Sequence, residues 1–172
     1  ISNNFIAKDV IDQITISEQL SPLFKADINL KNSFQTNIEI RKERTLSLSF
    51  ANSQVTEVNR TSYVLGAGYR FKDVEINVRM GGENTRKFKS DILLKADMSV
   101  NINRTILRKI DQNVNLVSSG SKVFTLNLSG EYSLTEQIIL KAYFEMTSNT
   151  PYVSNSYPNS TTQGGFSVRL TL

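Results

Sequence analysis

Side chains alternate with a period of two along residues 62–71, Ser-Tyr-Val-Leu-Gly-Ala-Gly-Tyr-Arg-Phe. One parity is entirely apolar and has an aromatic ring at each end: Tyr63, Leu65, Ala67, Tyr69 and Phe71. The other parity is mostly small and includes the charge of Arg70. Because successive side chains of a β-strand point to opposite faces, this segment predicts a strand with one apolar face. The alternation recurs along almost the whole chain, which predicts an all-β protein.

The composition agrees with strands that have one polar face. Only 39% of the 172 residues are hydrophobic, which is below the share usual in globular domains. No run of eighteen apolar residues occurs, so no helical membrane span is expected. The chain opens on Ile-Ser-Asn-Asn rather than Met, and we expect it to be a mature or excised piece of a longer protein.

Several classes of chemistry are excluded by residues that the chain lacks. It has no Cys and no His, which rules out disulfides, thiolate or imidazole metal ligands, and catalysis by Ser–His or Cys–His pairs. Pairs of acids such as Asp9 with Asp12, or Glu43 with Glu57, are expected to be solvated charges. The 20 basic and 16 acidic residues interleave, which disfavours nucleic-acid binding. We therefore expect no enzyme, no catalytic residue, no metal and no cofactor.

Ten segments carry the alternation, and turn or loop residues separate them. The predicted strands are 10–20, 23–30, 34–50, 55–71, 74–80, 88–102, 105–117, 124–132, 137–146 and 165–172. Tight connections are predicted near residues 32, 72, 104 and 135, and open ones near 21, 52, 83, 119 and 155. Short turns at one end of a sheet and longer loops at the other are typical of outer-membrane barrels.

The aromatic residues fall into two groups under this arrangement. The predicted girdle on the short-turn side is Phe34, Tyr69, Phe71 and Tyr132, and the one on the long-loop side is Phe24, Phe50, Phe124, Phe144 and Phe166. The fold class predicted from these patterns is all-β: an antiparallel meander of about ten transmembrane strands that forms part of a large outer-membrane β-barrel. Residues 1–172 are expected to be a single segment of that barrel, and the count of ten or twelve strands stays open.

The parity opposite the apolar one carries charges of both signs. A water-filled lumen tolerates such a wall, whereas a packed core does not, and mixed signs suit the passage of bulky cargo better than ion selection. Lys42, Arg44 and Arg108 fall on the apolar parity, so we expect them near a membrane interface, snorkelling, or against another protein. Residues 66–68, Gly-Ala-Gly, lie inside a strand and are expected to allow curvature or close approach rather than to bind phosphate.

The final segment is predicted to be a closing strand. Phe166, Val168, Leu170 and Leu172 give residues 165–172 a full apolar face. In a closed barrel the last strand must pair on both sides. We expect this one to pair with residues 137–146 on one side and with a strand outside this chain on the other.

Several stretches of the sequence resemble the C-terminal region of the SprA/Sov family. They are Ile-Thr-Ile-Ser-Glu-Gln-Leu-Ser-Pro-Leu at 14–23, Arg-Thr-Leu-Ser-Leu-Ser-Phe at 44–50, Thr-Glu-Val at 56–58, Tyr-Val-Leu-Gly-Ala-Gly-Tyr-Arg-Phe at 63–71, residues 106–111, Asn-Thr-Pro-Tyr-Val-Ser-Asn-Ser-Tyr at 149–157 and Phe-Ser-Val-Arg-Leu-Thr-Leu at 166–172. Members of this family are the giant outer-membrane translocon barrels of the type 9 secretion system, used in secretion and gliding motility by Bacteroidetes. The similarity spans most of the chain in order, although family members are many times longer.

The resemblance implies that this chain is the closing portion of a very large barrel in the cell outer membrane. It also implies partners: the remainder of the same barrel, a PorV-like shuttle barrel, a periplasmic plug, secreted protein cargo and outer-membrane lipid, with no nucleic acid. Two alternatives stay open beside this wall segment of a protein-conducting translocon. One is a stand-alone ten-stranded barrel acting as a porin or surface protein, and the other is a soluble β-rich binding module.

Overall fold

The computed structural model describes residues 11–31, 33–79, 85–135, 137–154 and 156–170. Seven strands account for most of them: β1 (Gln13–Asn29), β2 (Phe34–Ser49), β3 (Gln54–Arg79), β4 (Thr85–Lys109), β5 (Val114–Ser133), β6 (Ile138–Pro151) and β7 (Asn159–Leu170). The described residues contain no helix long and apolar enough to cross a membrane.

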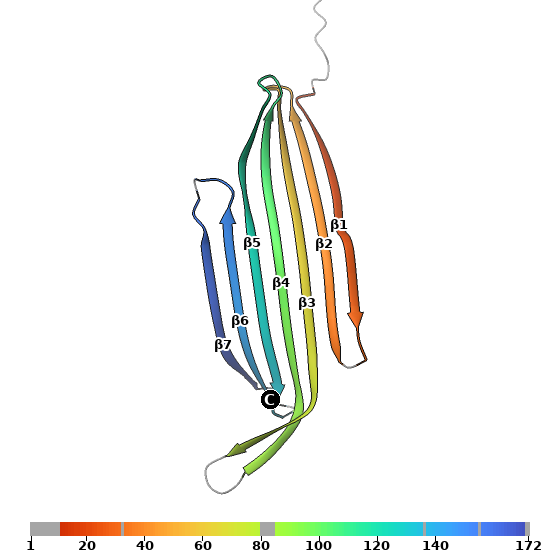
Figure 1. The fold of residues 1–172 in the computed structure, drawn as a ribbon, viewed down its shortest axis with the longest axis vertical. Coiled ribbons are helices and arrows are strands. Elements are labelled where there is room, and N and C mark those ends of the chain that lie inside the picture. The colour runs from red at the N-terminus through yellow and green to blue at the C-terminus, as the bar shows by residue number, and fades with distance from the viewer. Residues whose placement is uncertain (1–10, 32, 80–84, 136, 155, 171–172) are drawn as a thin grey trace, which may run out of the picture.

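The strands form one sheet in the order β1-β2-β3-β4-β5-β6-β7, so each pairs with its neighbours in sequence (Figure 1). All six pairings are antiparallel. This confirms the predicted all-β fold and the antiparallel meander. Within the described residues β1 pairs only with β2 and β7 only with β6, so each edge strand has one unpaired side.

Two of the predicted breaks are irregularities inside a strand. Ser21-Pro22 lies within β1, where the pairing with β2 shifts between Leu20 and Phe24. Residues 72–73 lie within β3, where the register shifts between Phe71 and Val74 and Asp73 has a φ of 58°. A bulge leaves its extra residue out of the ladder, so a strand can continue past a proline or a residue with positive φ. The structure therefore has one strand where two were predicted in both places.

The prediction for residues 103–121 is also wrong. β4 continues through Asn103 and Arg104 to Lys109, and the chain reverses at residues 110–113, where Asn113 has a φ of 51°. The predicted strand 105–117 is thus the end of β4, a turn and the start of β5. The predicted loop at 118–121 belongs to β5, because Ser118 is an extra residue in an otherwise continuous ladder with β4. These differences reduce the predicted ten strands to seven.

Other predicted boundaries agree with the structure. Residues 34–50 were expected to be one long strand, and β2 runs from Phe34 to Ser49 without a break at 41–44. The final strand pairs with β6 as predicted, and the ladder runs from the pair of Ile138 with Leu170 to the pair of Asn149 with Asn159. It starts earlier than predicted, at Asn159, and β6 continues to Pro151, so the open connection predicted near residue 155 comprises only residues 152–158. Leu172 lies outside the described residues.

Among the described connections, only one shows the predicted contrast between a short-turn end and a long-loop end. In Figure 1 the β2–β3, β4–β5 and β6–β7 connections lie at the upper end, and the β1–β2 and β5–β6 connections lie at the lower end. Residues 50–53 and 110–113 at the upper end are as short as residues 30–33 at the lower end. The connection of residues 152–158 is longer, and the loop predicted near residue 83 lies outside the described residues.

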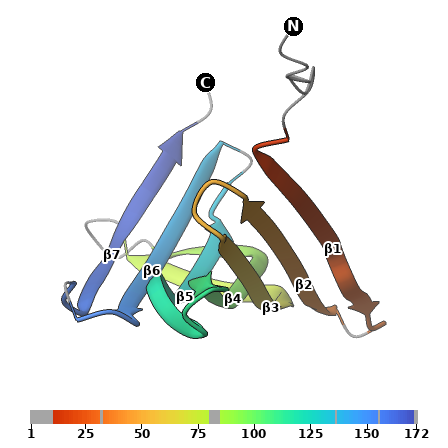
Figure 2. The same ribbon diagram turned by 90° about the horizontal axis from the view of Figure 1, so that it is seen from above.

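The sheet is a single curved layer rather than half of a packed sandwich. Viewed from above, β3, β4 and β5 bow toward one side, while β1 and β7 recede on either flank (Figure 2). Tyr132 is the one hydrophobic residue that is buried among those described. The large apolar side chains therefore remain on an uncovered surface instead of forming a core.

Candidate functional site: the two faces of the sheet

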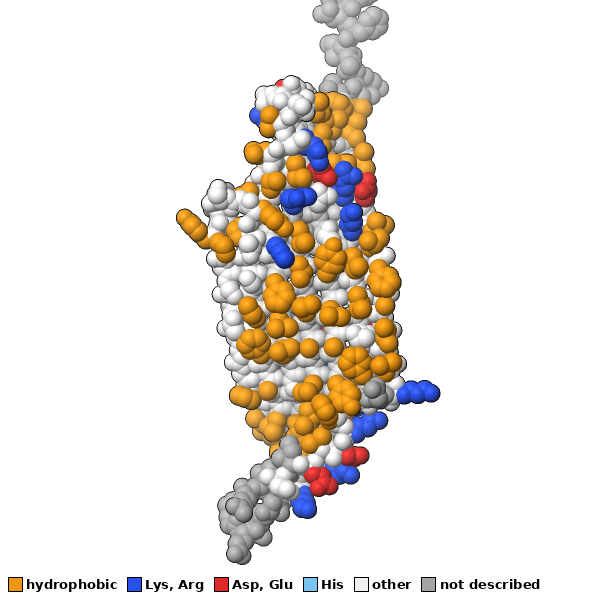
Figure 3. All heavy atoms as spheres, in the orientation of Figure 1, with side chains coloured by type: hydrophobic (Ala, Val, Ile, Leu, Met, Phe, Trp, Pro, Cys, Tyr) orange, Lys and Arg blue, Asp and Glu red, His pale blue; other side chains and the backbone are white. Residues whose placement is uncertain are grey.

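The apolar parities of all seven strands meet on one face of the sheet. The register aligns Tyr63 with Ile40 and Val100, and Leu65 with Ile38 and Met98, and the same alignment continues outward to both edges. Figure 3 shows the result as a band of hydrophobic side chains across the sheet, on the side toward which β3, β4 and β5 bow. We call this band the apolar face; its members include Phe24, Ile28, Ile38, Ile40, Tyr63, Leu65, Tyr69, Phe71, Leu94, Met98, Val100, Phe124, Leu126, Leu128, Leu140, Phe144, Met146, Phe166 and Val168.

Along β3 the apolar face extends over residues 63–71. A tilted strand crosses a bilayer with about 9–11 residues, and residues 63–71 match the lower end of that length. The side chains of the band are accessible: Leu65 is 42% exposed and Val168 is 63% exposed. A soluble protein rarely exposes a contiguous apolar surface that extends across a whole sheet.

The aromatic residues of the predicted short-turn girdle lie together at the lower end of the band. Phe34 pairs with Tyr69, and Phe71 and Tyr132 both pair with Ile92 in the next row. The rings of Tyr69 and Phe71 meet edge to face, with centroids 4.5 Å apart. The Tyr132 hydroxyl donates to the carbonyl oxygen of Val74 at 3.4 Å.

The predicted long-loop girdle does not lie in one row. Phe24 and Phe124 share a row with Tyr63, a residue that the sequence analysis left out of either girdle. Phe144 lies two rows below, and Phe166 pairs with Ala142 in the same row as Phe34 and Tyr69. Phe50 lies in the 50–53 connection, above the band. Phe166 therefore lies in a lower row than Phe24, because β7 begins at Asn159 rather than at the predicted residue 165.

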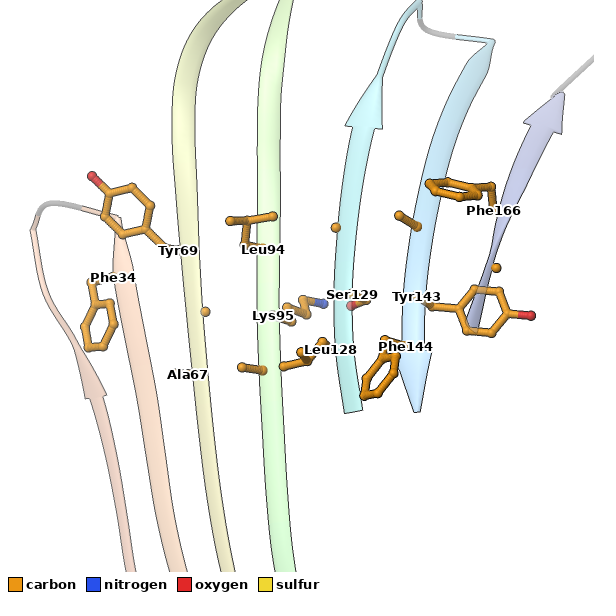
Figure 4. A pocket seen from close by; sticks show the side chains of 15 residues that line it. Phe34, Ala67, Tyr69, Leu94, Lys95, Leu128, Ser129, Tyr143, Phe144 and Phe166 are labelled. Atoms are coloured by element: carbon orange, nitrogen blue, oxygen red, sulfur yellow. The ribbon is translucent and has the colours of Figure 1, made fainter. Parts of the chain in front are cut away.

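A hollow of about 600 Å³ interrupts the apolar face near its lower end. Its floor is made of small residues on neighbouring strands, among them Ala67, Ala96, Gly130 and Ala142. Figure 4 shows Phe34 and Tyr69 on one side of it and Phe144 and Phe166 on the other. The hollow thus results from two adjacent rows in which alanine and glycine separate aromatic rings.

The opposite, polar face carries ion pairs of mixed sign. Arg41 donates to both carboxylate oxygens of Glu39, at 2.7 and 2.9 Å. Further pairs join Lys25 to Asp27 at 3.2 Å, Lys89 to Asp73 at 3.4 Å and Lys141 to Glu131 at 3.3 Å. Except for Glu39, which is half-buried, these side chains are largely exposed, so the face is a solvated surface with neither sign dominant.

Gly66 has a steric role on the polar face. A Cβ atom there would lie 2.0 Å from Oδ1 of Asn37 and 2.7 Å from Oδ1 of Asp97. The missing side chain allows polar groups of β2 and β4 to converge over β3. This agrees with the expectation that residues 66–68 serve close approach rather than phosphate binding.

A charged cluster lies on the apolar side of the sheet, above the band. Glu57 accepts hydrogen bonds from Nε of Arg44 at 2.9 Å, Nε of Arg108 at 3.0 Å and Nδ2 of Asn59 at 3.1 Å, and Nη2 of Arg108 also contacts it. Arg44 reaches Glu18 as well, at 3.7 Å. Glu57 is only 5% exposed, so the expectation that it is a solvated charge was wrong.

The cluster explains why Arg44 and Arg108 lie on the apolar parity. Each places its guanidinium diagonally across a strand pair against the same carboxylate, which ties β2, β3 and β4 together. The sequence suggested Glu57 only as an acid–base partner of Glu43 or a solvated charge, because the convergence of Arg44 and Arg108 on it depends on the register of three strands. Glu43, suggested as its partner in acid–base chemistry, lies on the opposite face and pairs with Arg60 at 3.9 Å.

The described residues contain no group of three or more acidic side chains placed to hold a metal ion. No family model matches the sequence, and no curated protein matches it either. The two faces of the sheet are therefore the features on which a function has to be argued.

Proposed function

We propose that this chain is part of the wall of a protein-conducting β-barrel in the outer membrane, of the kind that its sequence resembles in the SprA/Sov family. The observation that carries the proposal is the uncovered apolar face on the outward-bowed side of a single-layer sheet, with the charged polar face behind it. Lipid is the environment in which such a face is favourable, while the polar face meets water.

The unpaired sides of β1 and β7 support a wall segment over a complete barrel. Unpaired strand edges in a bilayer leave backbone N–H and C=O groups unsatisfied, so these sides need partner strands. We propose that the remainder of the same large barrel supplies them. A PorV-like shuttle barrel, a periplasmic plug and secreted protein cargo are the further partners that the resemblance implies.

The mixed charges of the polar face support bulky cargo rather than small ions. Ion-selective pores favour rings of one sign, whereas Lys25–Asp27, Arg41–Glu39 and Lys141–Glu131 neutralise one another along the wall. Such a wall attracts neither sign strongly, which suits a passage for proteins of varied charge.

Detection of the native protein in fractionated cells tests the proposal. An antibody against this chain should recognise a band far larger than 172 residues, in the outer-membrane fraction, and depletion of that protein should block protein secretion. A heat-modifiable band with the size of this chain alone would favour the stand-alone barrel. Recovery in the aqueous fraction without detergent would favour the soluble module.

Refolding of residues 1–172 in detergent separates the first two possibilities independently. We expect aggregates, because the two open edges of the sheet then pair between molecules. A monodisperse, heat-modifiable monomer would contradict the wall-segment proposal.

A further inference from the structure

Two adjacent rows above the apolar face concentrate basic side chains on the same side of the sheet. Lys42, Thr61, Ile102 and Lys122 form one row across β2 to β5, and Arg44, Asn59, Arg104 and Gly120 form the next. We call Lys42, Arg44, Arg104 and Lys122 the basic belt. In Figure 3 blue side chains lie above the hydrophobic band on this side, and further hydrophobic side chains lie above them toward the upper end of the sheet.

Three members of the belt are available to a ligand. Lys42, Arg104 and Lys122 are exposed, and among the described residues no ion pair joins them to a carboxylate. Arg44 differs, because Glu57 and Glu18 neutralise it. Like charges on neighbouring strands repel one another, so an anion that bridges them stabilises the belt.

The belt directly borders the apolar face. Lys42 lies two residues beyond Ile40 on β2, and Lys122 lies two residues before Phe124 on β5. If the apolar face meets the hydrocarbon of a bilayer, these cations lie at the depth of the lipid headgroups. Tyr152 packs against Gly120 beside them, as its backbone N–H donates to the Gly120 carbonyl at 2.9 Å. Tyrosine is common at this membrane level.

We infer that the basic belt binds the phosphate groups of membrane-lipid headgroups, with Lys42, Arg104 and Lys122 as the phosphate ligands. Guanidinium and ammonium groups bind phosphate through charge-assisted hydrogen bonds, which are strongest where water is partly excluded. The belt spans β2 to β5, about 14 Å at the usual spacing between strands, so it is wide enough for a headgroup with two phosphates. This inference rests on the membrane location in the proposed function.

The test compares a matched pair of lipids on the full protein that contains this chain. The protein is purified in a neutral detergent, and native mass spectrometry measures retention of diphosphoryl lipid A and of the same lipid after dephosphorylation. We expect the phosphorylated form to be retained about tenfold or more over the dephosphorylated form, since each basic residue near a membrane surface attracts anionic lipid. Lys42→Gln, Arg104→Gln and Lys122→Gln combined should abolish that preference.

The control removes the same charge from the polar face, by Lys95→Gln, Lys109→Gln and Arg169→Gln combined. It should keep the preference, as should the charge-preserving variant Lys42→Arg, Arg104→Lys and Lys122→Arg. That second variant keeps the test informative if the first one folds poorly. If the variant with all three belt residues replaced by Gln folds and still retains the phosphorylated lipid preferentially, the inference is wrong. So does displacement of the lipid by millimolar inorganic phosphate, which would indicate a site for free phosphate.

Other outcomes separate the inference from the proposed function. A protein that stays monodisperse in water without detergent contradicts the membrane location itself. A detergent-dependent protein whose belt variant loses a co-purified protein, yet keeps its lipid preference, contradicts only the lipid inference. In that case the belt is a contact for a protein partner.

Discussion

Glu57 shows how a single residue can lie against the pattern of its strand and still be satisfied. Its carboxylate occupies the apolar parity of β3, yet it is buried between Arg44 and Arg108 with Asn59 as a further donor. Alternation places this residue on the apolar face, whereas its charge taken alone places it in solvent. Its environment depends on arginines 13 and 51 residues away, which become neighbours only through the register of three strands.

Replacing Glu57 with Gln should destabilise the sheet near its upper end. The change leaves Arg108 without its counter-charge and leaves Arg44 with Glu18 alone, and we expect a loss of about 1–3 kcal/mol, since the arginines are partly exposed. The readout, on the full protein that contains this chain, is the temperature at which the folded, faster-migrating form in detergent converts to the unfolded form. Glu43→Gln is the matched control, because its 3.9 Å pair with Arg60 is an exposed one worth less than about 1 kcal/mol. Equal shifts for the two variants would contradict a structural role for the Glu57 cluster.

The two glycines of residues 66–68 are predicted to differ. Gly66→Ala would place its Cβ against Asn37 and Asp97, so it should cost about 1–3 kcal/mol as these side chains move aside. Gly68→Ala meets only the Leu94 carbonyl oxygen, at 3.7 Å, and should be neutral or slightly stabilising. Thermal unfolding in detergent measures both. If Gly68→Ala lowers the unfolding temperature and Gly66→Ala does not, polar side chains of β2 and β4 do not converge over Gly66.

At the scale of strands, the alternation of apolar side chains explains why some predicted strand boundaries were confirmed and others were wrong. Up to Phe71 the apolar side chains of this segment have odd numbers, and from Val74 onward they have even numbers. A two-residue hairpin turn would produce this change, and so would one extra residue within a continuous strand. The structure has the extra residue: residues 72 and 73 lie opposite Asp91 alone. The sequence therefore located the irregularity but could not show whether the chain reverses there.

The residues around Asn103 carry two conflicting patterns. Ile102, Ile106 and Ile110 keep one parity, which favours a continuous strand, whereas Asn103-Arg104 suggested a turn. β4 follows the parity, and the reversal occurs at residues 110–113, where Asp111 and Asn113 favour it. Long-range pairing with β3 and β5 overrides the local turn preference of Asn103.

The final strand gives a prediction at this scale. Phe166→Asp combined with Leu170→Asp places two charges on the apolar face of β7, where Phe166 is 91% exposed. A Lys or Arg that faces lipid at the bilayer midplane costs about 2–4 kcal/mol, and each Asp is expected to cost less than this. Membrane insertion and secretion of the double variant should therefore fail while synthesis continues. Ser167→Asp combined with Arg169→Asp changes the polar face of the same strand and should insert. Normal insertion of the first variant would contradict a role for β7 in assembly.

For the molecule as a whole, the fold class and the apolar face were predictable from alternation alone. The curvature of the sheet was not, because alternation along a strand carries no information on how neighbouring strands twist or bend. The basic belt also became visible only when the register aligned Lys42 on β2 with Lys122 on β5. These features decide whether a chain of alternating strands acts as a membrane wall or as a soluble sheet.

The most direct measurement is a cysteine scan along β3 in native outer membranes, labelled with a water-soluble maleimide. The chain has no Cys, so each introduced thiol is unique within it. We predict labelling at positions 64, 68 and 70 on the polar face, and none at 65, 67 and 69 until detergent or denaturant is added. Gly66 is left out, because a side chain there would collide with Asn37. Equal labelling of both parities in intact membranes would contradict the assignment of the apolar face to lipid, and with it the proposal of a membrane wall.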